Sequence, residues 1–440
     1  MIWGILLLAT IFRLVNINQS LWLDEASQVL MSQKSLYYII FERSGDFHPP
    51  LSYLMYHFWL MLGSSEIWLR LLPIIFGVST VFVIYKLSQK LFSEKIALIS
   101  ALFLATAPYH IYYSQEIRMY SMATFFASLS LYFFVTSKKW GYVLATVALL
   151  YTHYMGVFLV FGQLLYKKNL KLIGIVLLLY LPWIPFLWSQ LQTGVKADQY
   201  LPGWGSLLSL DPIKAIPLTF LKFSIGRIDF ENTYIYLLVA VGVLVFYGAL
   251  LLKAFKLKET KLIWFWLFIP ILLSWVISFF IPINQPFRLL FILPAFCILL
   301  AVGVNQLGRL WKLWLLGVTA ISLTGLSIYW TDPKFQREDW RTATQEVPNN
   351  AIFAWPVPFD PYIWYGGKGK GVIQHLPSEE TVAVKMLVLN QSEVYFFEYL
   401  QPLSDPNHLV QKWLDGNGYK LEKTLNYNGV GFVYKYKKNE

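Results

Sequence analysis

Apolar stretches separated by short polar connections dominate the first 330 residues of the chain. A membrane-spanning helix needs about 20 apolar residues, or somewhat fewer where the flanking side chains reach the interface. The pattern therefore predicts eleven spans, at 1–16, 67–88, 93–109, 118–136, 140–154, 155–166, 171–189, 232–252, 262–281, 288–306 and 312–330. The short stretches 140–154 and 155–166 are interpreted as a there-and-back hairpin, because Lys138, Lys139, Lys167 and Lys168 flank the pair.

Two connections are too long to be simple turns. In the loop 17–66, the stretches 25–40 and 50–62 are too short or too polar to cross, and their aromatic content is typical of helices lying in the membrane interface. The connection 190–231 contains several glycines and prolines, and we interpret it as an outer lid loop. Both connections face the same side of the membrane in the predicted topology.

The hydrophobic pattern changes at Thr331. Short β-branched and aromatic runs predict strands at 351–357, 382–390, 393–400 and 430–436, and a helix is predicted at 407–415. We therefore predict a polytopic α-helical membrane domain at 1–330, followed at 331–440 by a small soluble α+β domain outside the membrane.

Composition and charge agree with this division. The chain is 57% hydrophobic and 14% charged, with a net charge of +11 and a single cysteine, so it contains no internal disulfide. Alternate connections between the predicted spans carry fourteen Lys and Arg residues but only two acids, Glu94 and Glu259. This is the positive-inside pattern, which places the N-terminus in the cytoplasm and the C-terminal domain outside. A nucleic-acid-binding surface is disfavoured because this pattern accounts for the whole excess of positive charge.

Seven ionisable residues fall at the outer ends of the predicted spans: Asp24, Glu25, His48, Arg70, Glu116, Arg118 and Arg288. Each has a simpler explanation when taken alone. The arginines could reach lipid headgroups, Glu116 could pair with Arg118, Asp24 could cap a helix, and His48 could be a turn residue. Ionisable residues at a membrane edge are costly, however, and all seven lie on one side.

These residue types suit the displacement of a phosphate from a carbon atom. Arginines can bind the phosphate oxygens, and a carboxylate can act as general base for the attacking group. Burial beside Trp22 and the neighbouring Glu25 would raise the pKa of Asp24 towards a useful range. Alternatively, Asp24, Glu25 and Glu116 could hold a divalent cation, and the sequence leaves both possibilities open.

Five sequence motifs occur in an order that resembles a known family. They are Trp22–Glu25, His48–Leu51, Glu66–Pro73 with Gly77, Tyr113–Tyr120 and Pro286–Pro294, and Arg337–Arg341 adds a further similar motif. The chain resembles the GT-C membrane glycosyltransferases, in the branch of the protein O-mannosyltransferases and aminoarabinose transferases. The resemblance is closest in the first 165 residues.

The resemblance implies an inverting transferase, of the mannosyltransferase-like kind, that moves a hexose or pentose from a polyprenyl phosphate to an acceptor at the outer face. It implies that Asp24 is the base, that Glu116 is the second acidic site residue, and that Arg70 and Arg288 contact the donor phosphate. We also predict Glu25 as a catalytic residue and His48 and Arg118 as phosphate-binding residues. His48 stands where the aminoarabinose branch has lysine. A protein, lipid or glycan acceptor and an undecaprenyl or dolichyl carrier all fit.

A transporter or flippase would also need many spans and a few charges. Transporters place those charges near the bilayer midplane, whereas here the charges lie at the outer rim. A passive anchor for an outer binding module would not need eleven spans. The compact length favours an enzyme of a bacterial plasma membrane and cell envelope.

Overall fold

The computed structural model describes residues 1–440 except 43–46, 168, 201–209, 374–377, 388–390 and 439–440. The chain divides into two compact units. Unit 1 comprises Met1–Ile17, Ser35–Leu191 and Leu208–Phe335, and unit 2 comprises Asn18–Lys34, Gln192–Leu207 and Gln336–Glu440. The stretch from Asn18 to Lys34, which precedes most of unit 1 in the sequence, thus belongs to the same unit as the C-terminal residues. The predicted division into 1–330 and 331–440 stays a prediction.

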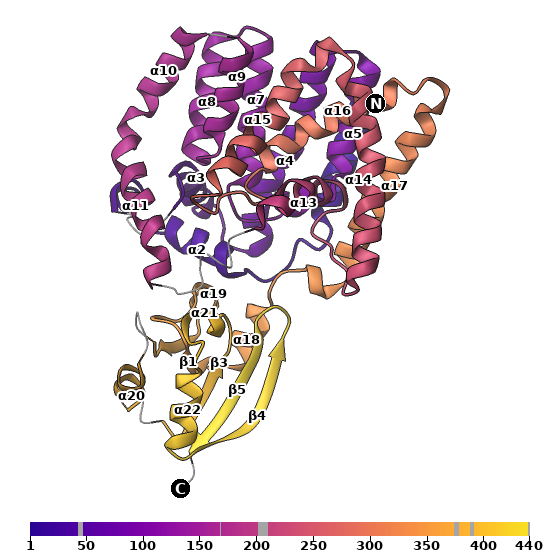
Figure 1. Ribbon diagram of the computed structural model, residues 1–440. Helices are drawn as coiled ribbons and strands as arrows, with labels where there is room; N and C mark the ends of the chain where they lie inside the picture. Colours follow the sequence, from indigo (N-terminus) through magenta and orange to yellow (C-terminus); the bar gives the residue numbers. More distant parts are fainter. Residues whose placement is uncertain (43–46, 168, 201–209, 374–377, 388–390, 439–440) are drawn as a thin grey trace. The chain divides into compact units, whose positions relative to one another are not determined.

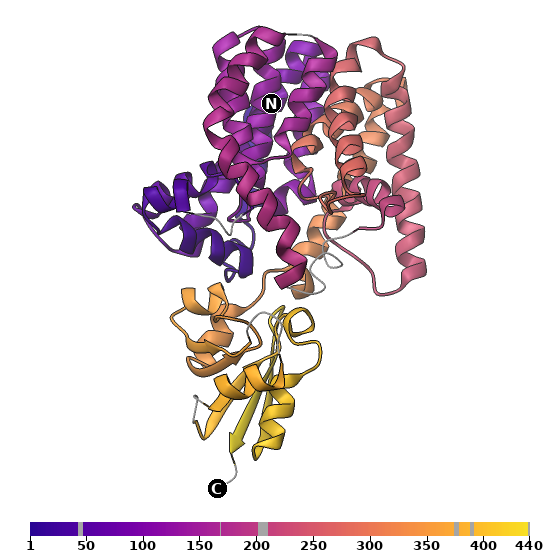
Figure 2. The ribbon, with the colours of Figure 1, turned by 60° about the vertical axis from the view of Figure 1, so that its left-hand side comes forward.

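Unit 1 is helical (Figure 1). Its helices follow the apolar runs, because a helix is the structure that satisfies all backbone polar groups within one apolar segment. They are α1 (Ile2–Leu14), α3 (Leu51–Leu60), α4 (Glu66–Leu91), α5 (Glu94–Thr106), α6 (Pro108–Ser114), α7 (Tyr120–Val135), α8 (Lys139–Thr152), α9 (Gly156–Tyr166), α10 (Leu170–Tyr180), α13 (Pro212–Ile225), α14 (Thr233–Phe255), α15 (Lys261–Ile277), α16 (Leu293–Asn305) and α17 (Trp311–Thr331). Helix α4 packs against α5 and α7, and α7 packs against α8. Figure 2 shows the ribbon from a second direction.

Within the described residues, five helical segments are long and apolar enough to cross a membrane, and the bent pair α5 and α6 would make a sixth. They are Glu66–Leu91, Leu170–Thr193, Thr233–Phe255, Lys258–Ile277 and Gly308–Thr331. Shorter apolar helices follow the other predicted spans, including Ile2–Leu14 and Tyr120–Val135. The protein is an integral membrane protein, and the count of eleven spans stays a prediction.

The two long connections both contain helical structure. The loop 17–66 contains α2 (Leu23–Ser32) and a single π-helical turn (Tyr38–Glu42) as well as α3. The connection 190–231 contains the end of α11 (Ile184–Tyr200) and all of α13, whose Leu221 and Phe223 are buried. Asp211 caps the helix in this connection that begins with Pro212. The interpretation of 190–231 as an outer lid stays a prediction. The predicted lid includes 201–209, which lie outside the described residues.

The C-terminal part of unit 2 is built on a five-stranded mixed sheet of order β2-β1-β3-β5-β4. Its strands are β1 (Asn349–Phe353), β2 (Lys368–Gly371), β3 (Glu393–Phe397), β4 (Tyr419–Tyr427) and β5 (Gly431–Lys438). Strand β1 is parallel to β2 and β3, whereas β5 is antiparallel to β3 and β4. Successive residues of β1 enter opposite cores: Ile352 packs with α20 (Glu379–Leu387) and α22 (Leu409–Gly416), and Phe353 packs with Trp340 and Tyr362.

The α+β class and the strands at β1, β3 and β5 are confirmed, as is a helix near 407–415. The strand predicted at 382–390 was wrong, since Glu379–Leu387 is helical and 388–390 lie outside the described residues. Val382 and Met386 are both buried, and their spacing of four residues places them on one face of a helix. Strands β2 and β4 were not predicted.

Candidate functional site

Three predicted phosphate-binding residues gather around a buried histidine in unit 1. His153 follows α8, is 6% exposed and lies within electrostatic range of His48, Arg118 and Arg288. We call these four residues the basic cluster. Arg118 Nη2 lies 3.3 Å from His48 Nε2. Because a guanidinium group can only donate, His48 Nε2 is the acceptor, so His48 orients the cation of Arg118.

Aromatic rings line this cluster. The His153 ring lies 6.0 Å from the Tyr120 ring, and Phe287 lies 5.4 Å from Tyr120 and 6.2 Å from Tyr113, all between ring centroids. The Arg288 guanidinium lies 5.7 Å from the Phe287 centroid and donates to the Pro282 carbonyl oxygen at 3.0 Å. Cations beside apolar ring surfaces attract an anion more strongly than cations in bulk water do, because screening is weaker there.

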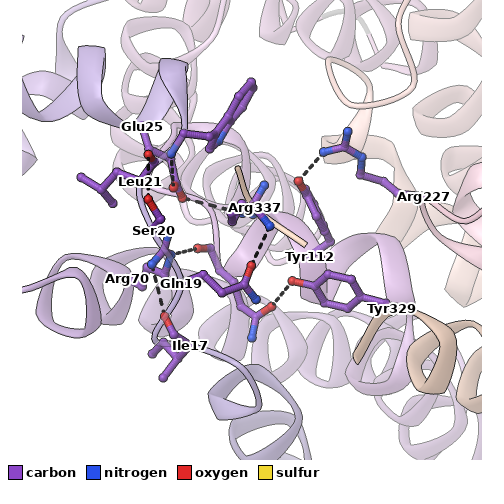
Figure 3. Close-up of polar contacts among 12 residues, drawn as sticks. Ile17, Gln19, Ser20, Leu21, Glu25, Arg70, Tyr112, Arg227, Tyr329 and Arg337 are labelled. Atoms are coloured by element: carbon purple, nitrogen blue, oxygen red, sulfur yellow. Dashed lines mark hydrogen bonds and ion pairs between the residues drawn. The ribbon is translucent and has the colours of Figure 1, made fainter. Parts of the chain in front are cut away.

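Arg70, the fourth predicted phosphate contact, makes a different set of contacts. It is 1% exposed, and its Nε donates to the Gln115 carbonyl oxygen at 3.1 Å while its Nη1 donates to the Ile17 carbonyl oxygen at 3.2 Å (Figure 3). The Gln115 side chain continues the network, donating to the Val15 carbonyl oxygen at 2.6 Å and accepting from the Tyr329 hydroxyl at 2.8 Å. Arg70 therefore helps to fix the turn that precedes α7.

That turn follows a break in a helix. Helices α5 and α6 are bent by 61° at Ala107–Pro108, and the bend leaves carbonyl groups of α5 without helical partners. The buried Arg13 guanidinium donates to Ala105 O at 3.2 Å and contacts Leu104 O at 3.4 Å. Its Nη2 also lies 2.7 Å from His110 Nδ1, which must be the acceptor. One cation of α1 thus supports the break that leads to Glu116.

Glu116 lies in this turn, between α6 and α7, and is 1% exposed. It is within electrostatic range of Tyr109 and Tyr113, as is Arg227. Arg227 donates to the Tyr112 hydroxyl and stacks its guanidinium 4.5 Å from that ring's centroid (Figure 3). Unit 1 therefore contains one predicted acid beside tyrosines and an arginine that the sequence analysis did not select.

The other two predicted acids lie on α2 in unit 2. Asp24 is partly buried, and the helix is capped by Trp22 and not by Asp24, so the capping explanation for Asp24 was wrong. Glu25 is fully buried; its Oε2 accepts from the Trp22 N–H at 3.4 Å, and its Oε1 lies 4.0 Å from Arg337 Nε (Figure 3). The structure thus gives Glu25 an internal ion pair and leaves Asp24 the more accessible of the two carboxylates.

Two further carboxylates of unit 2 interact with Asp24. Burial raises the pKa of Glu338 to about 7, opposed by hydrogen bonds from Trp340 Nε1 at 2.7 Å and the Tyr399 hydroxyl at 2.9 Å, while the charge of Asp24 raises it further. Burial and the charge of Asp24 likewise raise the pKa of Asp360, opposed by its hydrogen bond from Ser27. The charge of Asp24 therefore disfavours the ionisation of both Glu338 and Asp360.

Several of these residues were missed by the sequence analysis. Gln115 and Glu338 lie inside motifs that were recognised, whereas His153, Asp360 and Arg227 had no sequence signal beyond being polar in an apolar or mixed setting. Among the residues that the structure describes, no three His, Cys, Asp or Glu side chains are placed to hold a metal ion. The divalent cation suggested for Asp24, Glu25 and Glu116 stays a prediction.

Comparison with known proteins gives a family match over part of the chain and shows the fold. Residues 47–189 match the family model described as dolichyl-phosphate-mannose-protein mannosyltransferase. The whole chain superposes on ArnT from Cupriavidus metallidurans with a TM-score of 0.59 and 11% identity, covering 99% of this chain and 96% of that one. The chain has the GT-C fold. The predicted resemblance is thereby confirmed, and no curated protein sequence matches.

Other structures with the GT-C fold contain lipid phosphates. ArnT bound to undecaprenyl phosphate matches with a TM-score of 0.57 at 11% identity, covering 99% of this chain and 97% of that one. The oligosaccharyltransferase AglB from Archaeoglobus fulgidus, in complex with an inhibitory peptide and a dolichol-phosphate, matches with a TM-score of 0.52 at 11% identity. That alignment covers 98% of this chain and 74% of AglB.

Proposed function

We propose that this protein is an inverting glycosyltransferase that moves a sugar from a polyprenyl phosphate to an acceptor at the outer face of the membrane. The observation that carries the proposal is the basic cluster, in which His48, Arg118 and Arg288 lie within electrostatic range of His153, and aromatic rings lie beside His153 and Arg288. A phosphate leaving group needs such cations because it gains negative charge as its bond to the sugar breaks. The GT-C fold and the family match over residues 47–189 support the same reaction class.

The reaction would proceed in one displacement. An acceptor hydroxyl or amine attacks the anomeric carbon from the face opposite the phosphate, and the carbon–oxygen bond to the phosphate breaks, so the configuration inverts. The acceptor proton passes to Asp24, and the bonding electrons leave with the polyprenyl phosphate, which Arg118 and Arg288 stabilise. We assign Arg70 to the support of the turn that carries Glu116, because its Nε and Nη1 donate to backbone carbonyl groups.

The test is incubation of the purified protein with a panel of polyprenyl-phosphate sugars and measurement of the released lipid phosphate. The panel contains undecaprenyl and dolichyl carriers, and each donor is offered with a Ser/Thr peptide, a lipid headgroup and a surface glycan as acceptor. Transfer with inverted anomeric configuration supports the proposal and identifies the acceptor. Transfer with retention, or an absence of release with every donor while the protein remains folded, would overturn it.

A further inference from the structure

The first external segment and the C-terminal domain form one compact unit, although more than 300 residues separate them. Residues 18–34 join unit 2, and α2 packs against α19 (Asp360–Trp364). Leu23 also packs on the core formed by Trp340, Phe359 and Phe397. The segment with the proposed base is therefore held by residues from the other end of the chain.

Hydrogen bonds join the segment before Asp24 to the C-terminal domain. The Arg337 N–H donates to Gln19 Oε1 at 2.8 Å (Figure 3), and the Arg341 N–H donates to Ser20 Oγ at 3.0 Å. The Leu21 N–H donates to the Tyr365 hydroxyl at 2.8 Å. Two of these three contacts use a backbone N–H of the Arg337–Arg341 motif, so this motif helps to hold the segment that precedes Asp24.

Contacts beyond Asp24 fix the rotation of α2. Glu25 faces Arg337 with both side chains buried, and the Ser27 hydroxyl donates to Asp360 Oδ2. Successive residues of a helix point about 100° apart, so fixing Glu25 and Ser27 also fixes the direction in which the Asp24 side chain leaves α2. A carboxylate that removes a proton must be held in such a direction, because a displacement of about 1 Å can cost about a hundredfold in rate.

We propose that the C-terminal domain positions the catalytic base, with Tyr365, Asp360 and Arg337 as positioning residues that hold α2. This inference rests on the proposed function, because it takes Asp24 to be the base. The domain is then part of the catalytic apparatus. It holds a carboxylate in the orientation that proton removal requires.

The test compares two tyrosine variants in the full-length protein. Tyr365→Phe removes the hydroxyl that accepts from Leu21, whereas Tyr419→Phe removes a hydroxyl of the same domain that donates to the Gln391 carbonyl oxygen. We expect Tyr365→Phe to lower kcat about tenfold with an unchanged donor KM, since positioning acts on the transition state. Tyr419→Phe should retain both constants. Equal constants for the two variants would overturn the proposal.

A second pair tests the contact at Ser27. Ser27→Ala removes the hydrogen bond to Asp360 and should lower kcat with unchanged donor KM, whereas Ser27→Thr retains a hydroxyl and should restore most of the rate. Loss of activity in both variants, or a rise in donor KM in either, would contradict a positioning role. Thermal unfolding of all four variants verifies that they are folded.

Hydrogen exchange gives a readout that does not depend on transfer. In Tyr365→Phe, amides of residues 21–32 should exchange faster than in the parent protein, and in Tyr419→Phe they should not. Unchanged exchange in Tyr365→Phe would overturn the proposal even if the parent protein were inactive with every donor. Inactivity of the parent protein alone would instead overturn the proposed function.

Discussion

The basic cluster and the carboxylates around Asp24 belong to different compact units and are built in opposite ways. In unit 1, Arg118 and Arg288 are oriented by a histidine nitrogen and a backbone carbonyl group and are lined by aromatic rings. In unit 2, Asp24 lies among Glu338 and Asp360, whose neutral forms are favoured by burial. The basic cluster is suited to stabilise a leaving phosphate, and the carboxylates around Asp24 are suited to accept a proton.

This difference predicts that the kinetic constants separate by region. Substitutions in the basic cluster should change donor binding, and substitutions around Asp24 should change the rate of the bound complex. Variants at Asp24, Arg288 and His48 test that separation, and the pH dependence of stability tests the carboxylate region through Glu338; the largest expected effect comes first.

Asp24→Asn should reduce kcat about a thousandfold, or about 4 kcal/mol of transition-state stabilisation, because an amide cannot take the acceptor proton. Donor affinity should remain that of the parent protein, measured by binding of the labelled donor lipid. Parental turnover in Asp24→Asn would show that another group is the base.

Glu338 should make unit 2 less stable as the pH rises. Its pKa is about 7 in the folded protein against 4.5 for the ordinary group, so folding retains a proton between these values. Its contribution is fully present below pH 4.5 and is lost as the pH rises through 7, a change of about 3 kcal/mol. The midpoint temperature of thermal unfolding of the parent protein should fall from pH 5 to pH 8, and Glu338→Gln should reduce this dependence on pH. An identical slope in both would contradict the assignment.

Arg288→Ala should weaken donor binding about thirtyfold, or about 2 kcal/mol, because it removes a charge-assisted hydrogen bond to the phosphate. The control is Arg309→Ala, at an exposed arginine in the connection between α16 and α17, which should bind the donor as the parent protein does. Equal weakening in the two variants would mean that general charge, and not the basic cluster, attracts the donor.

His48→Gln should have the smallest effect, about twofold on donor KM, because an amide oxygen can still accept from Arg118. His48→Lys should raise donor KM more, since an ammonium group cannot accept and would repel the guanidinium. The opposite order would mean that His48 acts as a cation towards the phosphate.

The sequence was sufficient for features that depend on local pattern. The apolar runs correctly predicted helices such as Glu66–Leu91, and the short β-branched and aromatic runs correctly predicted β3 and β5. The run at 382–390 misled because its valines favour strands, whereas the buried pair Val382 and Met386 has helical spacing. Strand β4 carries mostly exposed residues and is held by pairing with β5, so it lacked an apolar signal.

The sequence allowed most of the residues of the candidate site to be selected, but it did not show which of them lie together in the folded chain. The motifs selected His48, Arg118 and Arg288, which do come together around His153. They could not show that Asp24 shares a unit with Glu338 and Asp360, because such contacts join residues more than 300 positions apart. No local periodicity records a contact of that separation, and only the folded chain reveals it.

The pairing of residues 18–34 with the C-terminal domain has a consequence for biosynthesis. Leu21 and its partner Tyr365 are separated by 344 residues, so at about 5–20 residues per second the ribosome makes the second roughly 17–70 seconds after the first. During that interval Glu25 has no Arg337 to pair with, and Leu23 has no apolar core to cover it. The contacts that hold α2 can therefore form only after the C-terminal domain has been synthesised.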